Sequence, residues 1–249
     1  MPTALDGPVR AITFDFWNTV MFEPEGGLES ARVDRWEQLL TEVERPRPRA
    51  DILAAHSAAV TDQQRAWHAN EQYVTTDATA TMLEHLELDL SPAETAAFDT
   101  VFVHAALGAG VRPCDGVATT LRRCHEHGVR LAIICDIGLT PATGVRALLT
   151  AEDLLDVFDV TVFSDEQGTY KPDVRIFEHT LSTLGVDPDA ALHVGDRRRT
   201  DVAGALDAGM GAVRYRAVFD DLDAAYRDAP FVIDHHDELV ELTGLALVG

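Results

Sequence analysis

Hydrophobic residues in this chain gather into six short runs that are separated by longer amphipathic stretches. The runs cover residues 11–16, 129–136, 160–165, 190–196, 211–216 and 231–236. Most are apolar almost throughout, which is typical of strands covered on both faces. Strands that alternate with helices predict an α/β fold with a doubly wound parallel sheet. The helices expected between them cover residues 114–127, 140–154, 173–184, 199–208 and 237–246.

The interval between the first two runs has a different pattern. It contains no convincing strand, and its amphipathic stretches cover residues 28–44, 50–71, 77–87 and 92–106. The sequence "SPAE" at 91–94 is a capping box with proline at the first helical position, a strong signal for a helix start. We therefore predict an all-α domain of four helices at 21–107, inserted into a Rossmann-like core domain made of 1–20 and 108–249.

Composition limits the classes of partner. The chain has 249 residues, of which 46% are hydrophobic, and its 42 acidic and 20 basic residues give a net charge of −22. Such a surface repels nucleic acid and anionic lipid, so neither is expected as a partner. The three cysteines form no close motif, the first ten residues do not resemble a signal peptide, and no apolar run reaches the about 18 residues of a membrane span. These features predict a cytoplasmic protein. We expect a monomer or a homodimer, a choice that the sequence leaves open.

Charged side chains stand where the predicted strands end. They are Asp15, Asp136, Lys171, Asp196 and Asp201. Ligands of open parallel sheets bind beyond the carboxyl ends of the strands, so we expect these residues to converge there. Lys171 is the only lysine in the chain. Its place in the loop after the third predicted strand favours a chemical role over chance.

Four motifs in this order resemble those of the haloacid dehalogenase superfamily of hydrolases, in its branch with a helical cap after the first strand. They are "FDFWNTV", "IICDIG", "KPD" and "GDRRRTD", and "VRPCDGV" is similar to the loop that leads out of the cap. Each motif alone is weak, because "KPD" or "GD" occurs by chance. All four in order, each at a predicted strand end or the loop after it, form a strong signal. The resemblance covers almost the whole chain.

The resemblance implies a set of roles. Asp15 would be the nucleophile, forming an aspartyl-phosphate that water then hydrolyses. Lys171 and a Mg²⁺ ion would supply the positive charge that a phosphate needs beside carboxylates, with the ion held by Asp15, Asp196 and the main-chain carbonyl of Trp17. Asp201 would be a further or water-mediated ligand, or would orient Lys171. The substrate would be a small phosphorylated molecule, and the residues expected to contact it are Trp17, Cys135, Asp136, Lys171 and Arg197.

Two positions depart from the family pattern. Phosphatases of this family carry a second aspartate, a general acid and base, where this chain has Trp17, and loss of a general acid costs ~10²–10⁴ in rate. Cys135 stands where serine or threonine is usual, and a thiol is a weak donor. The residues therefore leave open a Mg²⁺-dependent phosphatase, a 2-haloacid dehalogenase, or a phosphate-binding protein with weakened catalysis. The dehalogenating branch has an aromatic residue at position 17 but no carboxylate matching Asp196, so phosphatase chemistry is the better fit.

Overall fold

The computed structural model of the chain describes residues 8–23 and 26–243. Contacts between residues divide the described chain into two compact units. The first, here called the sheet unit, contains residues 8–22, 112–136 and 152–243. The second, called the helical unit, contains residues 23, 26–111 and 137–151.

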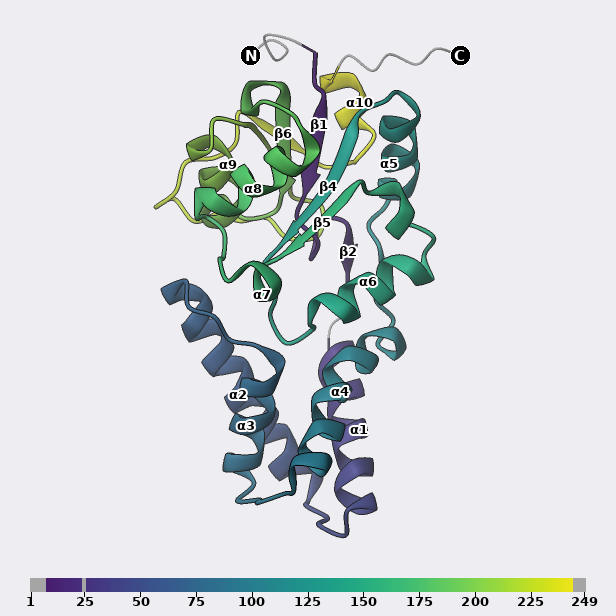
Figure 1. Cartoon of the computed structure of the whole chain (residues 1–249), viewed down its shortest axis with the longest axis vertical. Helices are drawn as coiled ribbons and strands as arrows, with labels where there is room; N and C mark the ends of the chain where they lie inside the picture. The colour runs from purple at the N-terminus through teal and green to yellow at the C-terminus, as the bar shows by residue number, and fades with distance from the viewer. Residues whose placement is uncertain (1–7, 24–25, 244–249) are drawn as a thin grey trace. The chain divides into compact units, whose positions relative to one another are not determined.

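A six-stranded sheet forms the centre of the sheet unit (Figure 1), and every neighbouring pair of its strands is parallel. The strand order is β5-β4-β1-β6-β7-β8. The strands are β1 (Ala11–Phe14), β4 (Arg130–Cys135), β5 (Val160–Phe163), β6 (Ala191–Gly195), β7 (Gly211–Tyr215) and β8 (Phe231–Ile233). Each of the six apolar runs contains one of these strands, so the predicted α/β fold with a parallel sheet is confirmed.

Helices cover both faces of this sheet. Figure 1 shows α8 and α9 on one side of the strands and α5 and α10 on the other, which is the doubly wound arrangement. On the first side Phe177, Val202 and Ile134 belong to one buried apolar cluster. The helical elements are α5 (Val117–Glu126), η1 (Leu155–Val157), α7 (Ser164–Gln167), α8 (Val174–Leu184), η2 (Pro188–Ala190), the π-helical turn η3 (Arg198–Val202), α9 (Ala203–Asp207) and α10 (Glu238–Leu242). The end of the helix expected at 237–246 lies outside the described residues.

The helical unit contains the four helices expected between the first two long strands. They are α1 (Gly27–Glu42), α2 (Arg49–Ala69), α3 (Thr75–His85) and α4 (Pro92–Gly108). Their apolar faces meet in a core that includes Trp36, Met82 and Phe98, all fully buried. The capping box is confirmed at the start of α4, where the Ser91 N–H donates to Glu94 Oε2 (2.8 Å) and the Glu94 N–H donates to Ser91 Oγ (3.4 Å).

Two features differ from the sequence expectations. A two-residue antiparallel pair, β2 (Met21–Phe22) with β3 (Arg112–Pro113), flanks the helical insertion. The sequence does not predict this pair of strands, because a strand of two residues is too short to show a hydrophobic periodicity. Helix α6 (Ala142–Ala151) groups with the helical unit although the sequence assigns it to the core domain. It packs closely on α4, since a Cβ at Gly144 would lie only 3.2 Å from the Val103 carbonyl oxygen. The role of residues 21–107 as a cap stays a prediction.

Candidate active site

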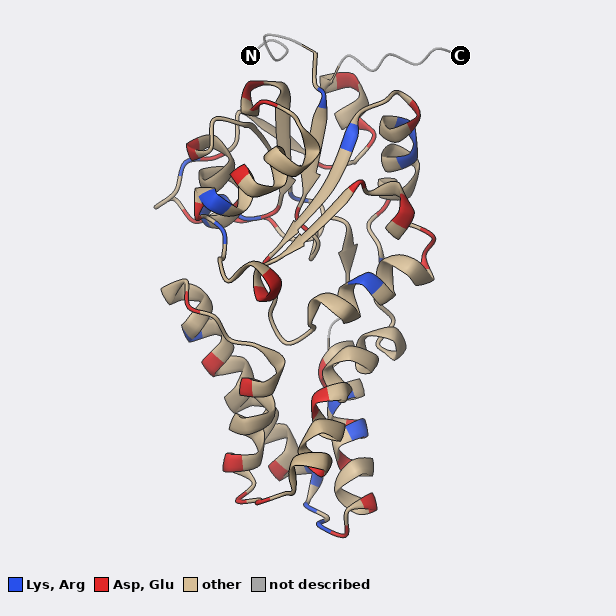
Figure 2. Ribbon diagram, viewed as in Figure 1, with Lys and Arg blue, Asp and Glu red and all other residues tan. Residues whose placement is uncertain are grey.

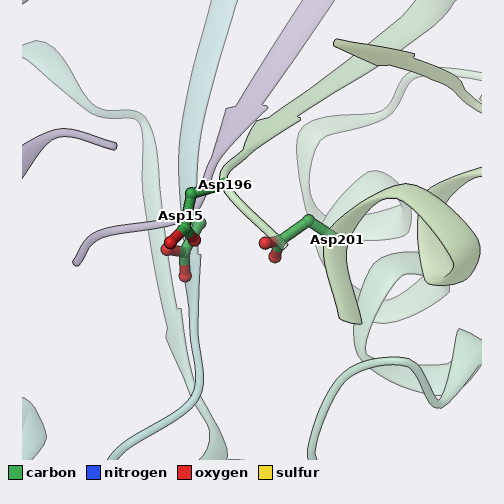
Figure 3. Close-up of side chains that lie close together, drawn as sticks. All are labelled: Asp15, Asp196 and Asp201. Carbon is green, nitrogen blue, oxygen red and sulfur yellow. The ribbon is translucent and has the colours of Figure 1, made fainter. Parts of the chain in front are cut away.

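Strand pairing brings Asp15 and Asp196 to the same edge of the sheet. Strands β1 and β6 are parallel neighbours with Phe14 paired to Val194, and the Asp15 N–H donates to the Val194 carbonyl (2.8 Å). Asp196 follows the last residue of β6. Figure 3 shows these two carboxylates side by side, with the carboxylate of Asp201 directed toward them from η3. One oxygen from each of the three lies within 4.8 Å of the others.

Lys171 connects two of these carboxylates. Its Nζ donates to Asp15 Oδ1 (2.6 Å) and to Asp201 Oδ1 (2.7 Å), and the residue is only 1% exposed. Its main-chain N–H donates to Asp136 Oδ1 (2.9 Å). The structure thus brings together the five charged residues that stand at the predicted strand ends. An ammonium bonded to two acids in a buried site also has little freedom to move.

The charges of this cluster do not balance. Burial raises the pKa of Asp15 to about 7 although the Lys171 ammonium opposes the shift, and the neighbouring Asp201 adds to it. Burial and the charge of Asp15 raise the pKa of Asp196 well above its ordinary value. Burial alone would raise the pKa of Asp201 too, but Lys171 and a hydrogen bond from His193 lower it below its usual range. The Lys171 ammonium and the Arg197 guanidinium, whose Nε lies 3.4 Å from Asp196 Oδ2, therefore do not hold the pKa values of Asp15 and Asp196 at their ordinary level.

A divalent cation fits this arrangement. Mg²⁺ takes carboxylate and carbonyl oxygens as ligands, and each of the three carboxylates of the cluster offers one oxygen close to the others. Both oxygens of Asp201 already accept hydrogen bonds, Oδ1 from Lys171 and Oδ2 from the N–H of Arg197 (2.8 Å). Asp15 and Asp196 are therefore the better placed to hold an ion, and Asp201 the better placed to orient Lys171.

The other three residues expected at the site lie around this cluster. Trp17 is half-buried, and its ring meets Phe16 edge-to-face at 4.9 Å. Cys135 is fully buried, its Sγ donates to the Asp136 carbonyl (3.5 Å), and burial raises its pKa so that the thiol stays protonated. Arg197 is partly exposed, with Nε 3.4 Å from Asp196 Oδ2 and its guanidinium 3.9 Å from the centre of the Phe219 ring.

Sequence reasoning missed His193, which supports the cluster from within β6. Its Nε2 lies 3.3 Å from Asp201 Oδ1 and its Nδ1 lies 2.7 Å from Thr13 Oγ1. Burial lowers the pKa of His193, so the ring is neutral. Because an ionised carboxylate only accepts, Nε2 carries the proton and Nδ1 accepts from the threonine hydroxyl. The sequence does carry one sign of this interaction. Thr13 in β1 and His193 in β6 are each a polar residue within an otherwise apolar strand.

A second missed residue, His236, holds the loop that follows β1. It is fully buried, and its Nε2 donates to the Thr19 carbonyl oxygen (2.8 Å). Its ring stacks on Tyr215 with 4.3 Å between centroids. Burial lowers the pKa of His236 to about 4, which keeps the ring neutral at pH 7. Nothing in the local sequence distinguishes it from His235, which is exposed.

Comparison with known proteins identifies the family. The model of the haloacid dehalogenase-like hydrolase family matches residues 9–209, so the chain belongs to this family. A glyceraldehyde 3-phosphate phosphatase of Pyrococcus furiosus is 31% identical over 163 residues, covering 65% of this chain and 66% of that protein. Haloacid dehalogenase-like hydrolase domain-containing protein 3 of Mus musculus is 33% identical over 115 residues, or 46% of this chain and 44% of that protein. The chain thus spans about half to two thirds of the length of the curated relatives it matches.

Solved structures show the same fold. A 2-haloacid dehalogenase from Pseudomonas syringae has a TM-score of 0.71 at 23% identity, covering 95% of this chain and 99% of that one. A phosphatase of this family from Thermococcus onnurineus has a TM-score of 0.66 at 24% identity, covering 95% and 98%. Because both are below 25% identity, they support the fold and do not separate the two activities.

Proposed function

We propose that this protein is a Mg²⁺-dependent phosphatase that acts on a small phosphorylated metabolite. The observation that carries the proposal is the bonding of Lys171 to Asp15 within a buried cluster of three carboxylates whose oxygens could hold a metal ion. The names of the relatives that are glyceraldehyde 3-phosphate phosphatases support the same chemistry. The three cysteines are free and buried, which suits the reducing cytoplasm.

Asp15 is the nucleophile in this proposal. One of its carboxylate oxygens attacks phosphorus, and the bond from phosphorus to the leaving oxygen breaks. Water then hydrolyses the aspartyl-phosphate and restores the carboxylate. Lys171 restrains Asp15 through Oδ1 and offsets the charge of the incoming phosphate, while Asp201 orients Lys171.

Asp15, Asp196 and the main-chain carbonyl of Trp17 would hold Mg²⁺. When bound, the ion supplies positive charge that attracts the phosphate and stabilises the charge developing during transfer. Asp136, Cys135 and Arg197 are proposed to contact the substrate. Trp17 cannot donate a proton to the leaving oxygen at neutral pH, so we expect the best substrates to have leaving groups that need no acid.

Phosphate release from p-nitrophenyl phosphate, which has a good leaving group, and from a panel of esters that includes glyceraldehyde 3-phosphate tests the proposal. We expect release to require Mg²⁺ and Asp15→Asn to lower kcat/KM by ~10³ or more. Asp51→Asn, a change at an exposed residue of α2, is the matched control and should leave kcat/KM unaltered. Release that persists without Mg²⁺, or in Asp15→Asn, would contradict the proposal.

Trp17 favours a second candidate, dehalogenation of a 2-haloacid. The buried carboxylate of Asp196 argues against it, because without a cation it would repel the carboxylate of a haloacid. Chloride release from 2-chloropropionate in excess chelator would establish this activity. If neither the racemic 2-chloropropionate nor either of its enantiomers releases chloride, dehalogenation of a 2-haloacid is excluded as the function.

A further inference from the structure

The segment between β7 and β8 places an aromatic ring beside the candidate site. Residues 216–230, all of them described, contain no helix or strand, yet Phe219 within them is half-buried. The guanidinium carbon of Arg197 lies 3.9 Å from the centre of the Phe219 ring. Nε of the same arginine lies 3.4 Å from Asp196 Oδ2. An aromatic residue of this segment therefore contacts an arginine that is itself next to a carboxylate of the buried cluster.

Hydrogen bonds from a buried arginine fasten this segment at two points. Arg214 lies in β7 and is 2% exposed. Its Nη1 donates to Asp220 Oδ1 (2.6 Å), and its Nε and Nη2 donate to the two carboxylate oxygens of Asp228 (2.6 and 3.0 Å). Breaking these contacts would leave a buried charge without its partners, which is strongly destabilising. The segment is therefore held directly after Phe219 and again near its end.

The turn that contains Arg197 is fastened to the same segment. The main-chain N–H of Arg198 donates to Asp221 Oδ2 (2.7 Å), and Arg198 Nη2 donates to Asp228 Oδ2 (2.8 Å). Asp221 is 7% exposed, so its contact is shielded from water. Arg197 and Phe219 thus belong to two backbone segments that are joined by hydrogen bonds close to both residues. Their contact is part of a fixed arrangement of the backbone.

An arginine held in this way is suited to bind an anion. A cation over the face of an aromatic ring is attracted to the ring, and the guanidinium still has donors that match the oxygens of a phosphoryl group. A side chain that is already restrained loses less conformational freedom when it binds a ligand. Contact with Phe219 should therefore strengthen the binding of an anion by Arg197.

We propose that Phe219 is a positioning residue that holds Arg197 ready to bind the phosphoryl group of the substrate. This inference rests on the proposed function, in which Arg197 contacts the substrate, and it adds the segment 216–230 to the site. Phe219 touches no reacting atom and acts only through Arg197. Its removal should therefore lower activity only when Arg197 is present.

A double-mutant cycle tests this dependence. With p-nitrophenyl phosphate and Mg²⁺, we expect Phe219→Leu to lower kcat/KM ~3–10-fold, the effect of a lost cation–π contact. Arg197→Met should lower it ~10–100-fold, the effect of a lost charge-assisted hydrogen bond. In the double variant, Phe219→Leu should add less than about 2-fold to the loss caused by Arg197→Met.

The cycle also separates positioning from a defect in folding. A structural defect caused by Phe219→Leu would lower kcat/KM by the same factor whether or not Arg197 is present. Equal losses in the two backgrounds, or an Arg197→Met variant with the kcat/KM of the wild-type protein, would overturn the inference.

Conservative variants separate the aromatic face from simple packing. Phe219→Tyr keeps a ring and should have a kcat/KM within about 2-fold of wild type, whereas Phe219→Leu keeps only apolar bulk. Leu222→Ala, a change at a residue of the same segment that is 74% exposed, is the control and should leave kcat/KM and Tm unaltered. A Phe219→Tyr variant as impaired as Phe219→Leu would contradict the role of the ring.

Binding of inorganic phosphate distinguishes a failure of this inference from a failure of the proposed function. Calorimetry in the presence of Mg²⁺ measures this binding and needs no turnover. A phosphate affinity that Phe219→Leu lowers ~3–10-fold and Phe219→Tyr leaves unchanged supports the positioning role even if the wild-type protein hydrolyses no ester. A phosphate affinity that Phe219→Leu does not change rejects the role even if phosphatase activity is established.

Discussion

At the scale of single residues, Lys171 is the side chain that links two of the buried carboxylates of the site. Its buried ammonium is bonded to Asp15 and Asp201, and these acids keep its pKa well above the ordinary value although burial acts in the opposite direction. A buried charge that loses its partner is strongly destabilising. The only lysine of the chain is therefore important for the fold as well as for the proposed chemistry.

Replacement of this ammonium gives a prediction with a defined pH dependence. Lys171→Met should abolish phosphatase activity and lower the free energy of unfolding by about 3–5 kcal/mol at pH 7.5. A carboxyl group whose pKa is raised in the folded state destabilises the fold fully above the folded-state value, and this penalty decreases as pH falls below that value and vanishes below the unfolded-state pKa. Since the pKa of Asp15 is about 7 even with Lys171 present, the deficit should shrink by pH 5.

Urea unfolding at pH 7.5 and pH 5 measures this deficit. Arg175→Met is the control, because Arg175 forms an exposed ion pair with Asp173 and should give a small deficit at both pH values. An equal loss of stability at the two pH values in Lys171→Met would contradict the electrostatic explanation.

At the scale of elements, the turn from β6 into η3 shapes the cluster. A Cβ at Gly195 would lie 2.3 Å from Asp201 Cγ and 2.5 Å from Asp201 Cβ. Such contacts are impossible without moving Asp201, which is bonded to Lys171, His193 and the Arg197 N–H. Glycine at the end of this strand therefore allows a side chain of the following turn to reach back to the sheet edge.

Gly195→Ala should accordingly displace Asp201 and release Lys171. We expect kcat/KM for a phosphate ester to fall ~10²-fold or more, because a misplaced catalytic group costs this much, and Tm to fall as well. Gly108→Ala is the control, since a Cβ at Gly108 meets nothing within 4 Å and the change should leave both quantities near wild type. Normal activity in Gly195→Ala would show that Asp201 does not position Lys171.

At the scale of the whole molecule, negative charge dominates. The net charge is −22, and Figure 2 shows Asp and Glu spread over the ribbon of both units. Among the described residues, no helix is both long and apolar enough to cross a membrane. A divalent cation that binds only the folded chain would relieve repulsion where the acids are most concentrated and most deeply buried.

Mg²⁺ should therefore stabilise the protein. At a concentration 100 times Kd, one site adds about 2.7 kcal/mol to the free energy of unfolding. Tm should rise more with MgCl₂ than with NaCl of equal ionic strength, and Asp196→Asn should remove most of the difference. If the difference between the two salts is the same in Asp196→Asn, Mg²⁺ is binding elsewhere.

Much of this organisation was predictable from the sequence, because each prediction depended on a local pattern. Nearly continuous apolar runs indicated the six strands, and a capping box indicated the start of α4 at Pro92. The rule that ligands bind at the carboxyl ends of parallel strands predicted that Asp15, Lys171 and Asp196 converge. Each of these signals consists of residues close together in the sequence, so it can be recognised without knowledge of contacts between distant residues.

Only the tertiary structure decided the rest. It set the strand order, and it brought together residues that are far apart in the chain, such as His193 with Thr13 and His236 with Thr19. A residue's pKa and its unmet hydrogen bonds depend on what packs around it, and the sequence alone does not specify that environment. The sequence by itself therefore determined which chemical groups the protein has and at which strand ends they stand, whereas packing decided their charge and their partners.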